Sequence, residues 1–444
     1  MNIARLNFSH GNFFAHEKRI KSIRKATEAT GVPVAIMADL PGPKMRIGQL
    51  ANEPVELLPG SIFTLTTEDI LGDQNRVSVT FSRLPSAVKR GDALFLNDGL
   101  IQLEVLGVAN NDVRCLVLVG GELRSRKGLN LPGIDLGISA FTKKDHDYLR
   151  FAVEQGIDAV SQSFVESAKD IEAVRDAAAA LGGNPFIIAK IERSRALDQM
   201  EGILNAADGI MVARGDLGVE TPIERIAVLQ KQLIQQANLL GKPVITATQM
   251  LESMTGNRRP TRAESTDVAN AILDGTDCVM LSGESAMGEY PVECVAMLSR
   301  IAESVEPYRT YFPARQALSG SDPDRTADLA HLVALGVLTV VERITPDVVI
   351  VPTRSGRTAR ILSGFKLPTW IASVSSQKAT CQNSLFSYGV WPIHEPDHPQ
   401  DWKAFARRWL KSQGLEPRLV VLTEGPSSKY PDTNNRMEII DMTR

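Results

Sequence analysis

Hydrophobic and polar positions alternate in two ways along the chain, and each way predicts a different element. Continuous apolar runs predict strands that are buried on both faces, as in a parallel sheet. Such runs occur at 159–163, 186–189, 209–213, 244–248 and 278–282. The stretches between them carry helix start signals, in which a hydroxyl N-cap precedes an acid by three residues. These signals lie at Thr142, Ser167 and Thr221, the last with Pro222 at the first helical position.

Two more apolar stretches, one from Ile3 and one at 32–38, flank a predicted helix that ends at Gly31. The alternation of strands and helices predicts an α/β fold with parallel strands, and a (β/α)8 TIM barrel is the matching architecture. Such a barrel needs eight strands, and the count falls one short at the N-terminal end. Met1 lies almost within the first predicted strand, so we expect a barrel whose first strand is missing from this sequence.

Two regions depart from this alternation. Between 47 and 127, short alternating segments are separated by Gly, Asn and Asp turns, which predicts an inserted all-β domain. A polar stretch at 319–323 predicts a linker, and strands and helices alternate again beyond it. We therefore predict a barrel domain at 1–46 and 128–311, a β-rich domain at 47–127 and a C-terminal open α/β domain at 325–444.

Composition excludes several classes of protein. The net charge of −3 over 444 residues gives no basic field for nucleic acid, and no apolar run is long enough to predict a membrane span. The 4 cysteines form no CxxC pair and the 6 histidines have no zinc-ligand spacing. We expect a cytoplasmic protein with reduced cysteines and with neither a nucleic-acid nor a membrane partner.

Candidate chemistry lies where the predicted strands end. The run at 209–213 leads into Arg214, Gly215 and Asp216, and the run at 186–189 leads into Lys190 and Glu192. Two carboxylates beside a lysine and an arginine suit a divalent cation that holds an anionic substrate. A helix cap is the alternative for Asp216 alone. Strand ends in a barrel converge on one face, and the further polar residues there are Arg5, Asn7, Ser9, Asp39, Arg46, Ser163, Thr248 and Glu284.

Several long motifs in this order resemble the signature stretches of pyruvate kinase. They are IARLNFSHG at 3–11, NLPG at 130–133, IAKIE at 188–192, MVARGDLGVE at 211–220, ATQMLESM at 247–254, RPTRAE at 259–264 and MLSGE at 280–284. The resemblance runs through the whole chain. It implies an enzyme of glycolysis that transfers the phosphoryl group of phosphoenolpyruvate to ADP, giving pyruvate and ATP. It also implies a homotetramer.

The resemblance implies a role for each residue of the barrel site. Lys190 would lie beside the transferring phosphoryl group and the enolate oxygen, and Thr248 would help to deliver a proton to the enolate. Glu192 and Asp216 would bind Mg²⁺. The backbone of Ala213, Arg214 and Gly215 would receive the substrate carboxylate.

The resemblance also implies how phosphate and nucleotide are held. Arg5 and Arg46 would clamp phosphate, a task suited to guanidinium groups. His10 and Lys127 would contact the nucleotide, and the β-rich domain would act as a lid. Asp98 is the lid residue expected to face the site, with an ordinary turn aspartate as the alternative.

The loop after Asp39 departs from most of the family. Those enzymes need K⁺, and the residues matching its ligands are Asn7, Ser9, Asp39 and the carbonyl of Leu40. Here Lys44 occupies the position of a family glutamate, and its fixed ammonium can replace the bound ion. The resemblance is thus to the K⁺-independent branch, and we expect a requirement for Mg²⁺ but not for K⁺. A solvated loop lysine is the alternative.

The C-terminal domain carries a second candidate site. A predicted strand meets a helix at a loop of hydroxyls and arginines, a pattern typical of anion sites. By resemblance, this loop would bind a phosphorylated allosteric effector; an ordinary capped turn is the alternative. The loop residues are Thr353, Arg354, Ser355, Gly356, Arg357 and Thr358. Two other functions stay open, namely a metal-dependent aldolase acting on pyruvate enolate and a truncated homologue with impaired activity.

Overall fold

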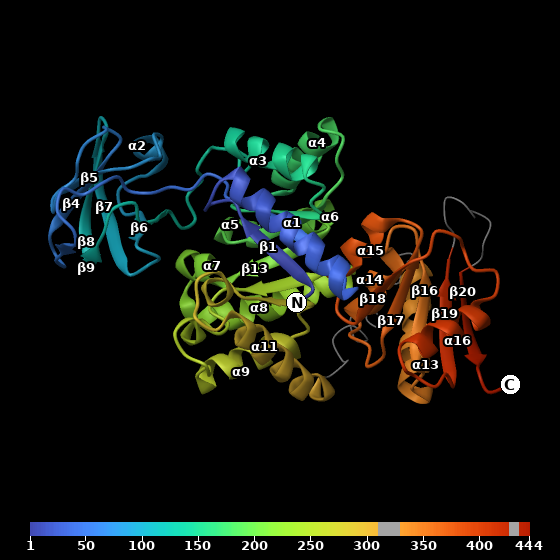
Figure 1. The fold of residues 1–444 in the computed structure, drawn as a ribbon. Coiled ribbons are helices and arrows are strands. Elements are labelled where there is room, and N and C mark those ends of the chain that lie inside the picture. Colours follow the sequence, from blue (N-terminus) through green and yellow to red (C-terminus); the bar gives the residue numbers. More distant parts are fainter. Residues whose placement is uncertain (310–328, 426–434) are drawn as a thin grey trace, which may run out of the picture.

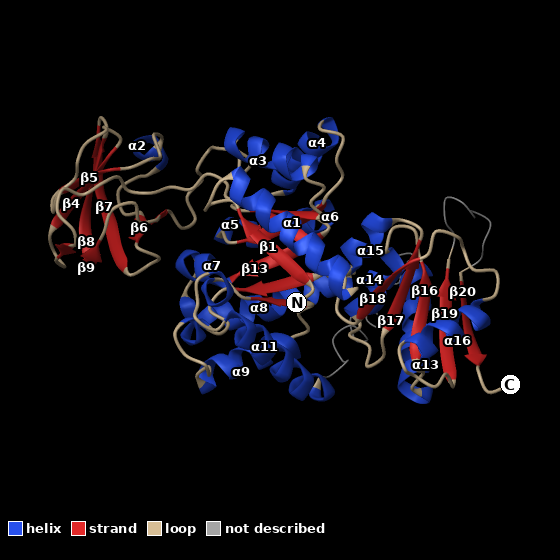
Figure 2. Cartoon of the chain, viewed as in Figure 1, coloured by secondary structure: helices blue, strands red, loops and turns tan. Residues whose placement is uncertain are grey.

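The computed structural model describes residues 1–309, 329–425 and 435–444. Three groups of strands lie in a row in Figure 1, and Figure 2 shows which of them are covered by helices. The β-rich domain at 47–127, named the lid after its expected role, lies beyond one end of the central barrel sheet, and the C-terminal domain lies beyond the other. The predicted linker at 319–323 and the predicted domain ends at 311 and 325 fall outside the described residues.

The central sheet has seven parallel strands in the order β1-β2-β11-β12-β13-β14-β15. In the described part of the chain, no pairing joins β1 to β15. The α/β class and the strand count predicted from the apolar runs are confirmed. The strands are β1 (Ile3–Asn7), β2 (Ala35–Leu40), β11 (Ala159–Gln162), β12 (Phe186–Ile191), β13 (Gly209–Ala213), β14 (Val244–Ala247) and β15 (Cys278–Met280).

Helices cover the outside of this sheet (Figure 2). The longer ones are α1 (Phe13–Thr30), α3 (Lys143–Glu154), α4 (Ala168–Ala180), α6 (Met200–Ala206), α8 (Ile226–Leu239), α9 (Arg262–Leu273) and α11 (Pro291–Val305). Short helices α5 (Ser194–Leu197), α7 (Arg214–Glu220) and α10 (Gly283–Ala286) follow strand ends, and 3₁₀ turns occupy Ile223–Arg225, Glu252–Thr255 and Glu306–Tyr308.

Two of the three predicted helix starts are confirmed. Thr142 and Ser167 form capping boxes with Asp145 and Asp170. The predicted start at Thr221 is wrong, because its hydroxyl donates to the carbonyl of Leu217 at 2.8 Å and closes the preceding helix α7 instead. Helix α8 begins only at Ile226, after a 3₁₀ turn.

The lid and the C-terminal domain have cores of their own. The lid pairs β3 (Val55–Leu57) with β9 (Gly121–Leu123), and its main sheet has the order β10-β6-β7-β8-β4-β5. That sheet contains β4 (Ile62–Thr66), β5 (Arg76–Ser78), β6 (Ala93–Leu96), β7 (Ile101–Ala109), β8 (Asp112–Val119) and β10 (Leu129–Asn130), with the short helix α2 (Leu84–Ala87) beside it.

The C-terminal sheet has the order β18-β17-β16-β19-β20, and only its last pair is antiparallel. Its strands are β16 (Val348–Pro352), β17 (Ile371–Ser375), β18 (Val390–His394), β19 (Leu419–Glu424) and β20 (Arg436–Asp441). Its helices are α13 (Leu329–Ile344), α14 (Arg357–Gly364), α15 (Lys378–Ser384) and α16 (Trp402–Ser412). None of the helices in the described ranges is long and apolar enough to cross a membrane.

The C-terminal domain closes the amino end of the barrel sheet. Leu385 and Phe386 join the buried cluster inside the barrel, and the Phe386 ring stacks on Phe186 with centroids 5.3 Å apart. Since Phe186 is the first residue of β12, this contact lies where the strands begin. The carboxyl ends of the strands therefore remain as the open end, on the side of the lid (Figure 1).

Candidate active site

Lys190 is the centre of the cluster at the carboxyl ends. It lies on β12 with 8% of its surface exposed, and its Nζ is 2.7 Å from Glu192 Oε1 and 3.3 Å from Asp39 Oδ1. It also donates to Ser163 Oγ at 2.7 Å. Burial by itself would lower the pKa of Lys190, but the Asp39 and Glu192 carboxylates raise it above its ordinary value. The buried Lys190 ammonium therefore stays charged at the carboxyl end of the sheet.

Asp39 links the first three strands of the sheet at this end. Its carboxylate accepts from Arg5 Nε at 2.8 Å, and Ser161 Oγ donates to its other oxygen at 2.8 Å. Burial opposes the charged form, yet Lys190 and Arg5 together hold the pKa of Asp39 below its usual range. Arg5, predicted to clamp phosphate, is fixed by this ion pair while a fifth of its side chain stays exposed (20%).

Glu192 and Asp216 have the donor chemistry of a Mg²⁺ site. Desolvation by the surrounding protein, together with the negative charge of Glu192, raises the pKa of Asp216 to about 6. Asp216 is nevertheless exposed to solvent at the start of α7, whereas Glu192 is buried and accepts from the Phe164 amide at 2.9 Å. Mg²⁺ is commonly held by one or two carboxylates plus oxygens of the substrate. Two carboxylates that repel each other, of which Asp216 is exposed to solvent, fit this kind of site. In the described ranges, no group of three or more His, Cys, Asp or Glu side chains is arranged around a metal position.

Thr248 lies outside its predicted strand. The chain leaves β14 after Ala247, and Thr248 adopts a φ of 71°. A β-branched residue in this left-handed region stores about 1–3 kcal/mol of backbone strain, a cost that is found most often at functional sites. Its hydroxyl accepts from the Gly215 amide at 2.8 Å and donates to the Ala247 carbonyl at 2.6 Å.

Gly215 and Arg214 meet Thr248 in different ways. A Cβ added at Gly215 would lie 3.4 Å from Thr248 Oγ1, which is an ordinary van der Waals distance, so α7 begins directly beside Thr248. The Arg214 guanidinium, in contrast, binds the carbonyls of Ala247 and Thr248 and the carboxylate of Asp267. The Gly215 amide is therefore engaged by Thr248, and the Arg214 side chain is engaged by the backbone of 247–248 and by Asp267.

The lid reaches the same end of the barrel through the turn at Asn97-Asp98-Gly99. A Cβ on Gly99 would lie 3.3 Å from Val219 of α7, and the charge of Asp98 contributes to the raised pKa of Asp216. Arg46 connects the two segments that enter and leave the lid, since its guanidinium donates to the Arg126 carbonyl at 2.7 Å and its backbone forms an isolated bridge with Gly128.

The other residues predicted to contact nucleotide lie near this entrance. Lys127 is half-buried, and its carbonyl accepts from Ile47 at 2.9 Å. His10 is exposed in the loop after β1, where its carbonyl contacts the ring of His16 at 2.8 Å.

The residues of the family's K⁺ site are close together in the chain's fold. Asn7 Oδ1 accepts from the Ser9 amide at 3.0 Å, and the Leu40 carbonyl accepts from the Ser163 amide at 3.3 Å. Lys44 is exposed. Desolvation and the positive charges of Lys190 and Arg46 lower the pKa of Lys44, and the negative charges of Asp39 and Glu192 oppose them. The net effect is a pKa below the ordinary value of a lysine. Its ammonium therefore lies within the electrostatic field of the Lys190 cluster.

The comparisons with known proteins agree with one another. A family model described as pyruvate kinase, barrel domain matches residues 1–295, and one described as pyruvate kinase, alpha/beta domain matches residues 331–440. A pyruvate kinase of Thermococcus litoralis is 45% identical over 98% of this chain and 92% of its own length. The chain belongs to the pyruvate kinase family. Further relatives named pyruvate kinase are those of Thermotoga maritima, 38% identical over 98% of this chain and 92% of their own, and Geobacillus stearothermophilus, 41% identical over 99% and 76%.

The loop predicted to bind a pyruvate kinase effector joins β16 to α14. Gly356 has a φ of 77° and its amide donates to Thr353 Oγ1 at 2.9 Å. The Arg354 carbonyl accepts from Thr380 at 2.6 Å, and the Ser355 carbonyl accepts from Arg360 at 2.9 Å. Arg354, Ser355 and Arg357 are exposed, while Thr353 and Thr358 are half-buried. The loop is thus held by its carbonyls, with its cationic side chains at the surface.

Two contributors to the pyruvate kinase site escaped sequence reasoning. Ser161 binds Asp39 from the middle of β11, and only its inward position two residues before Ser163 could have indicated it. Asp267 on α9 holds Arg214 at 2.7 Å, and no local signal marks it.

Glu284 is buried and accepts from the amides of Leu251 and Ser282, so it supports the loops after β14 and β15.

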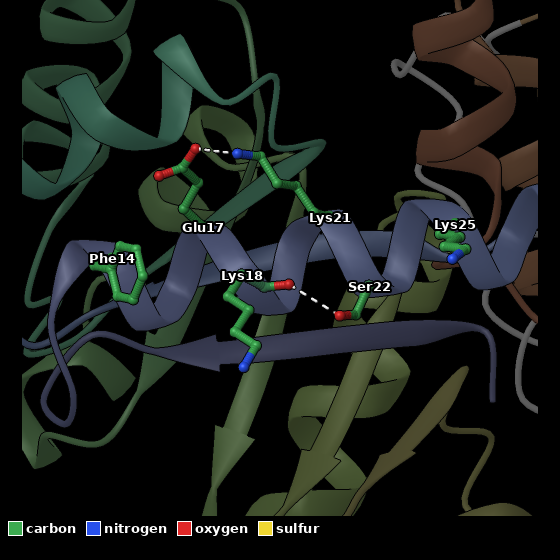
Figure 3. Close-up of a pocket in the computed structure, with 6 residues that line it drawn as sticks. All are labelled: Phe14, Glu17, Lys18, Lys21, Ser22 and Lys25. Carbon is green, nitrogen blue, oxygen red and sulfur yellow. Dashed lines mark hydrogen bonds and ion pairs between the residues drawn. The ribbon is translucent and has the colours of Figure 1, made fainter.

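Concavities elsewhere do not coincide with this cluster. One of about 310 Å³ lies on the outer face of α1, between Phe14 and three lysines, where Lys21 pairs with Glu17 (Figure 3). Another of about 460 Å³ lies beside the loops after β2, β11 and β12. Neither concavity is lined by Lys190, Glu192 or Asp216. The candidate active site is therefore identified by its charged side chains and not by a cavity.

Proposed function

We propose that this chain transfers the phosphoryl group of phosphoenolpyruvate to ADP, giving pyruvate and ATP, the last step of glycolysis. The observation that carries the proposal is the buried Lys190 ammonium, held by Asp39, Glu192 and Ser163 beside the open carboxylate of Asp216. Phosphoryl transfer depends mainly on positioning and on stabilising developing negative charge. A fixed cation beside a metal-binding carboxylate pair supplies both.

The residues at the strand ends take distinct roles in this proposal. Lys190 and Arg5 neutralise charge on the phosphoryl group, and Lys190 also does so on the enolate oxygen. Glu192 and Asp216 hold Mg²⁺, which supplies Lewis-acid stabilisation of the substrate oxygens when bound. The backbone of 213–215 receives the substrate carboxylate, which replaces Thr248 Oγ1 as the acceptor of the Gly215 amide. Thr248 helps to deliver the proton that converts the enolate into pyruvate.

The nucleotide is held between the barrel and the lid. Arg46, Lys127 and Asp98 come from the lid or its two connections, and His10 comes from the loop after β1. Closure of the lid over the carboxyl ends would exclude water from the transfer. The contact of Gly99 with Val219 supports this role, because it already brings the lid turn against α7.

We propose further that the enzyme needs Mg²⁺ but not K⁺. The electrostatic interaction of Lys44 with Asp39 and Glu192 supports this, because it indicates that the lysine ammonium lies near the two carboxylates of the cluster. Initial rates at constant ionic strength, with K⁺ exchanged for tetramethylammonium, are expected to be unchanged. In Lys44→Glu, added K⁺ is expected to raise the rate. Strong activation of the unaltered enzyme by K⁺ would contradict the proposal.

The remaining expectations are proposals of the same kind. The exposed arginines of the β16–α14 loop support a site for a phosphorylated effector. Loss of labelled sugar-phosphate binding in Ser355→Ala/Arg357→Ala would support it, and unchanged binding would contradict it.

The four free cysteines support a cytoplasmic location. We also propose the homotetramer and the division into a barrel (1–46, 128–311), a lid (47–127) and a C-terminal domain (325–444).

A coupled assay tests the proposed reaction. Pyruvate formation from phosphoenolpyruvate is measured with ADP and Mg²⁺, and then with each omitted. We expect pyruvate only when all are present, and about a hundredfold to thousandfold less in Lys190→Gln. Lys242→Gln is the matched control, because Lys242 is a half-buried lysine at the amino end that binds the Ala207 carbonyl at 2.6 Å. No pyruvate from the unaltered enzyme would overturn the proposal.

A further inference from the structure

Arg214 follows β13 directly but does not face the carboxylate cluster. Its side chain is 10% exposed and contacts five groups, two of which are Gln230 Oε1 at 3.3 Å and Met250 Sδ at 2.8 Å. Nε donates to the Ala247 carbonyl at 3.3 Å, Nη2 to the Thr248 carbonyl at 2.7 Å, and Nη1 to Asp267 Oδ1 at 2.7 Å. The guanidinium thus binds the carbonyls of the two peptide groups on either side of Thr248.

The gripped backbone is strained. Thr248 and Gln249 have φ values of 71° and 52°, so two successive residues with side chains are left-handed at the end of β14. A threonine does not keep this conformation without support, because its β-branch disfavours it. In this conformation the Thr248 carbonyl accepts from Arg214 at 2.7 Å, and the Thr248 hydroxyl accepts from the Gly215 amide at 2.8 Å.

We propose that the side chain of Arg214 is a positioning group that holds Thr248 for protonation of the enolate, and that its guanidinium is not a ligand of the substrate carboxylate. The inference rests on the proposed function. In that step the enolate C3 forms a bond to a proton delivered by way of Thr248, while the enolate oxygen becomes the keto oxygen of pyruvate. A Thr248 hydroxyl displaced by a relaxed backbone would leave binding of phosphoenolpyruvate intact and slow this proton transfer.

A lysine cannot replace the arginine here. The guanidinium fork reaches two carbonyls and one carboxylate in fixed directions, whereas an ammonium is a single point charge on a flexible stem. Arg214→Lys therefore keeps the positive charge but loses the grip. Arg24→Lys is the matched control, because Arg24 binds the carbonyls of Val34 and Gly156 and the carboxylate of Asp158 at the opposite end of the sheet.

Proton transfer can be measured apart from phosphoryl transfer. Exchange of the methyl protons of pyruvate in D₂O, with Mg²⁺ and ATP present, is followed by proton NMR beside kcat and the KM for phosphoenolpyruvate. In Arg214→Lys we expect exchange and kcat to fall about tenfold or more, and KM to stay within about threefold. A large rise in KM with exchange retained would make Arg214 a substrate ligand and overturn the inference. Exchange equal to that of Arg24→Lys would also overturn it.

Two further variants keep the inference testable if Arg214→Lys folds poorly. Asp267→Asn leaves the arginine in place but loosens it, and we expect a smaller loss of exchange in the same direction. Thr248→Ser removes the β-branch, so Arg214→Lys should cost less exchange in that background than in the unaltered enzyme. Unchanged exchange in Asp267→Asn, or an equal loss in both backgrounds, contradicts the inference. Absence of both pyruvate formation and exchange in the unaltered enzyme instead contradicts the proposed function itself.

Discussion

The two ends of the barrel sheet use the same residue type for opposite purposes. At the amino end, Asp158, Asp208 and Asp277 each precede a strand and accept a backbone N–H from the start of the neighbouring strand. The donors are Ile36 at 2.7 Å, Ile187 at 2.9 Å and Val244 at 2.9 Å. Each aspartate is also paired with a cation, namely Arg24, Arg175 and Lys366. These carboxylates are satisfied and bind the strands together.

At the carboxyl end the arrangement is unbalanced. Asp216 is open to solvent, and crowding together with the Glu192 carboxylate raises its pKa to about 6. The backbone beside it is strained at Thr248. The comparison teaches that an aspartate in a parallel sheet is structural where a backbone amide and a cation satisfy it. An aspartate that faces solvent and another carboxylate is available for a metal ion and a substrate.

The largest effect is expected when the open carboxylate is neutralised. Asp216→Asn should lower kcat/KM about a hundredfold to thousandfold, because the neutral amide no longer balances the charge of Mg²⁺. Its unfolding midpoint should stay the same or rise, since the repulsion from Glu192 disappears. Asp208→Asn is the control, because Asp208 lies at the other end of the same strand. Equal activity losses in the two variants, measured with thermal unfolding, would break the comparison.

The reverse pattern is expected at the amino end. Asp277 accepts from Lys366 at 2.7 Å and from the Tyr388 amide at 2.9 Å, and so joins β15 to the C-terminal domain. Asp277→Ala leaves the buried Lys366 without its carboxylate, and should lower the free energy of unfolding by about 3–5 kcal/mol. The activity of each folded molecule should be nearly retained. Chemical denaturation tests this, and Asp277→Ala/Lys366→Met should recover part of the loss.

The next largest effect is expected at low pH, where the carboxyl end of the sheet should change before the amino end. Below a pH of about 6, Asp216 takes up a proton that competes with Mg²⁺, so the apparent Mg²⁺ affinity should fall about tenfold for each further pH unit. Because the folded pKa of Asp216 is raised above the ordinary value of an aspartate, ionisation of Asp216 destabilises the metal-free protein as pH rises toward 6. Mg²⁺ titrations between pH 7 and pH 5 test the first statement. An affinity that stays flat over that range would show that Asp216 is not a ligand.

The smallest effect is expected at a satisfied aspartate. Asp158→Asn keeps an oxygen that can accept from the Ile36 amide and loses only the ionic pairing with the partly exposed Arg24. The expected change in the free energy of unfolding is less than about 1 kcal/mol, with unchanged kcat. Denaturant titration and the coupled assay check both values. A measurable loss of activity would mean that the amino end also controls the chemistry.

Much of the fold could be predicted because strand and helix signals are local. The apolar run at 209–213 placed β13 at the right bounds, and the capping boxes placed the starts of α3 and α4. The start predicted at Thr221 failed, since the same hydroxyl can end one helix or begin the next, and packing of α7 decided between them. The end of β14 also failed by one residue, because Arg214, far away in sequence, holds Thr248 outside the strand.

Sequence by itself determined the order of strands and the residue types at their carboxyl ends, because periodicity and motifs are carried by neighbouring residues. It therefore indicated Lys190, Glu192 and Asp216 before any contact was known. Only the tertiary structure decided which of these charges satisfy one another. Asp39 pairs with Arg5 and Lys190, whereas Asp216 stays open, and Arg214 turns to Thr248 and Asp267. The physical reason is that burial and pairing depend on distances between strands, which no local pattern encodes.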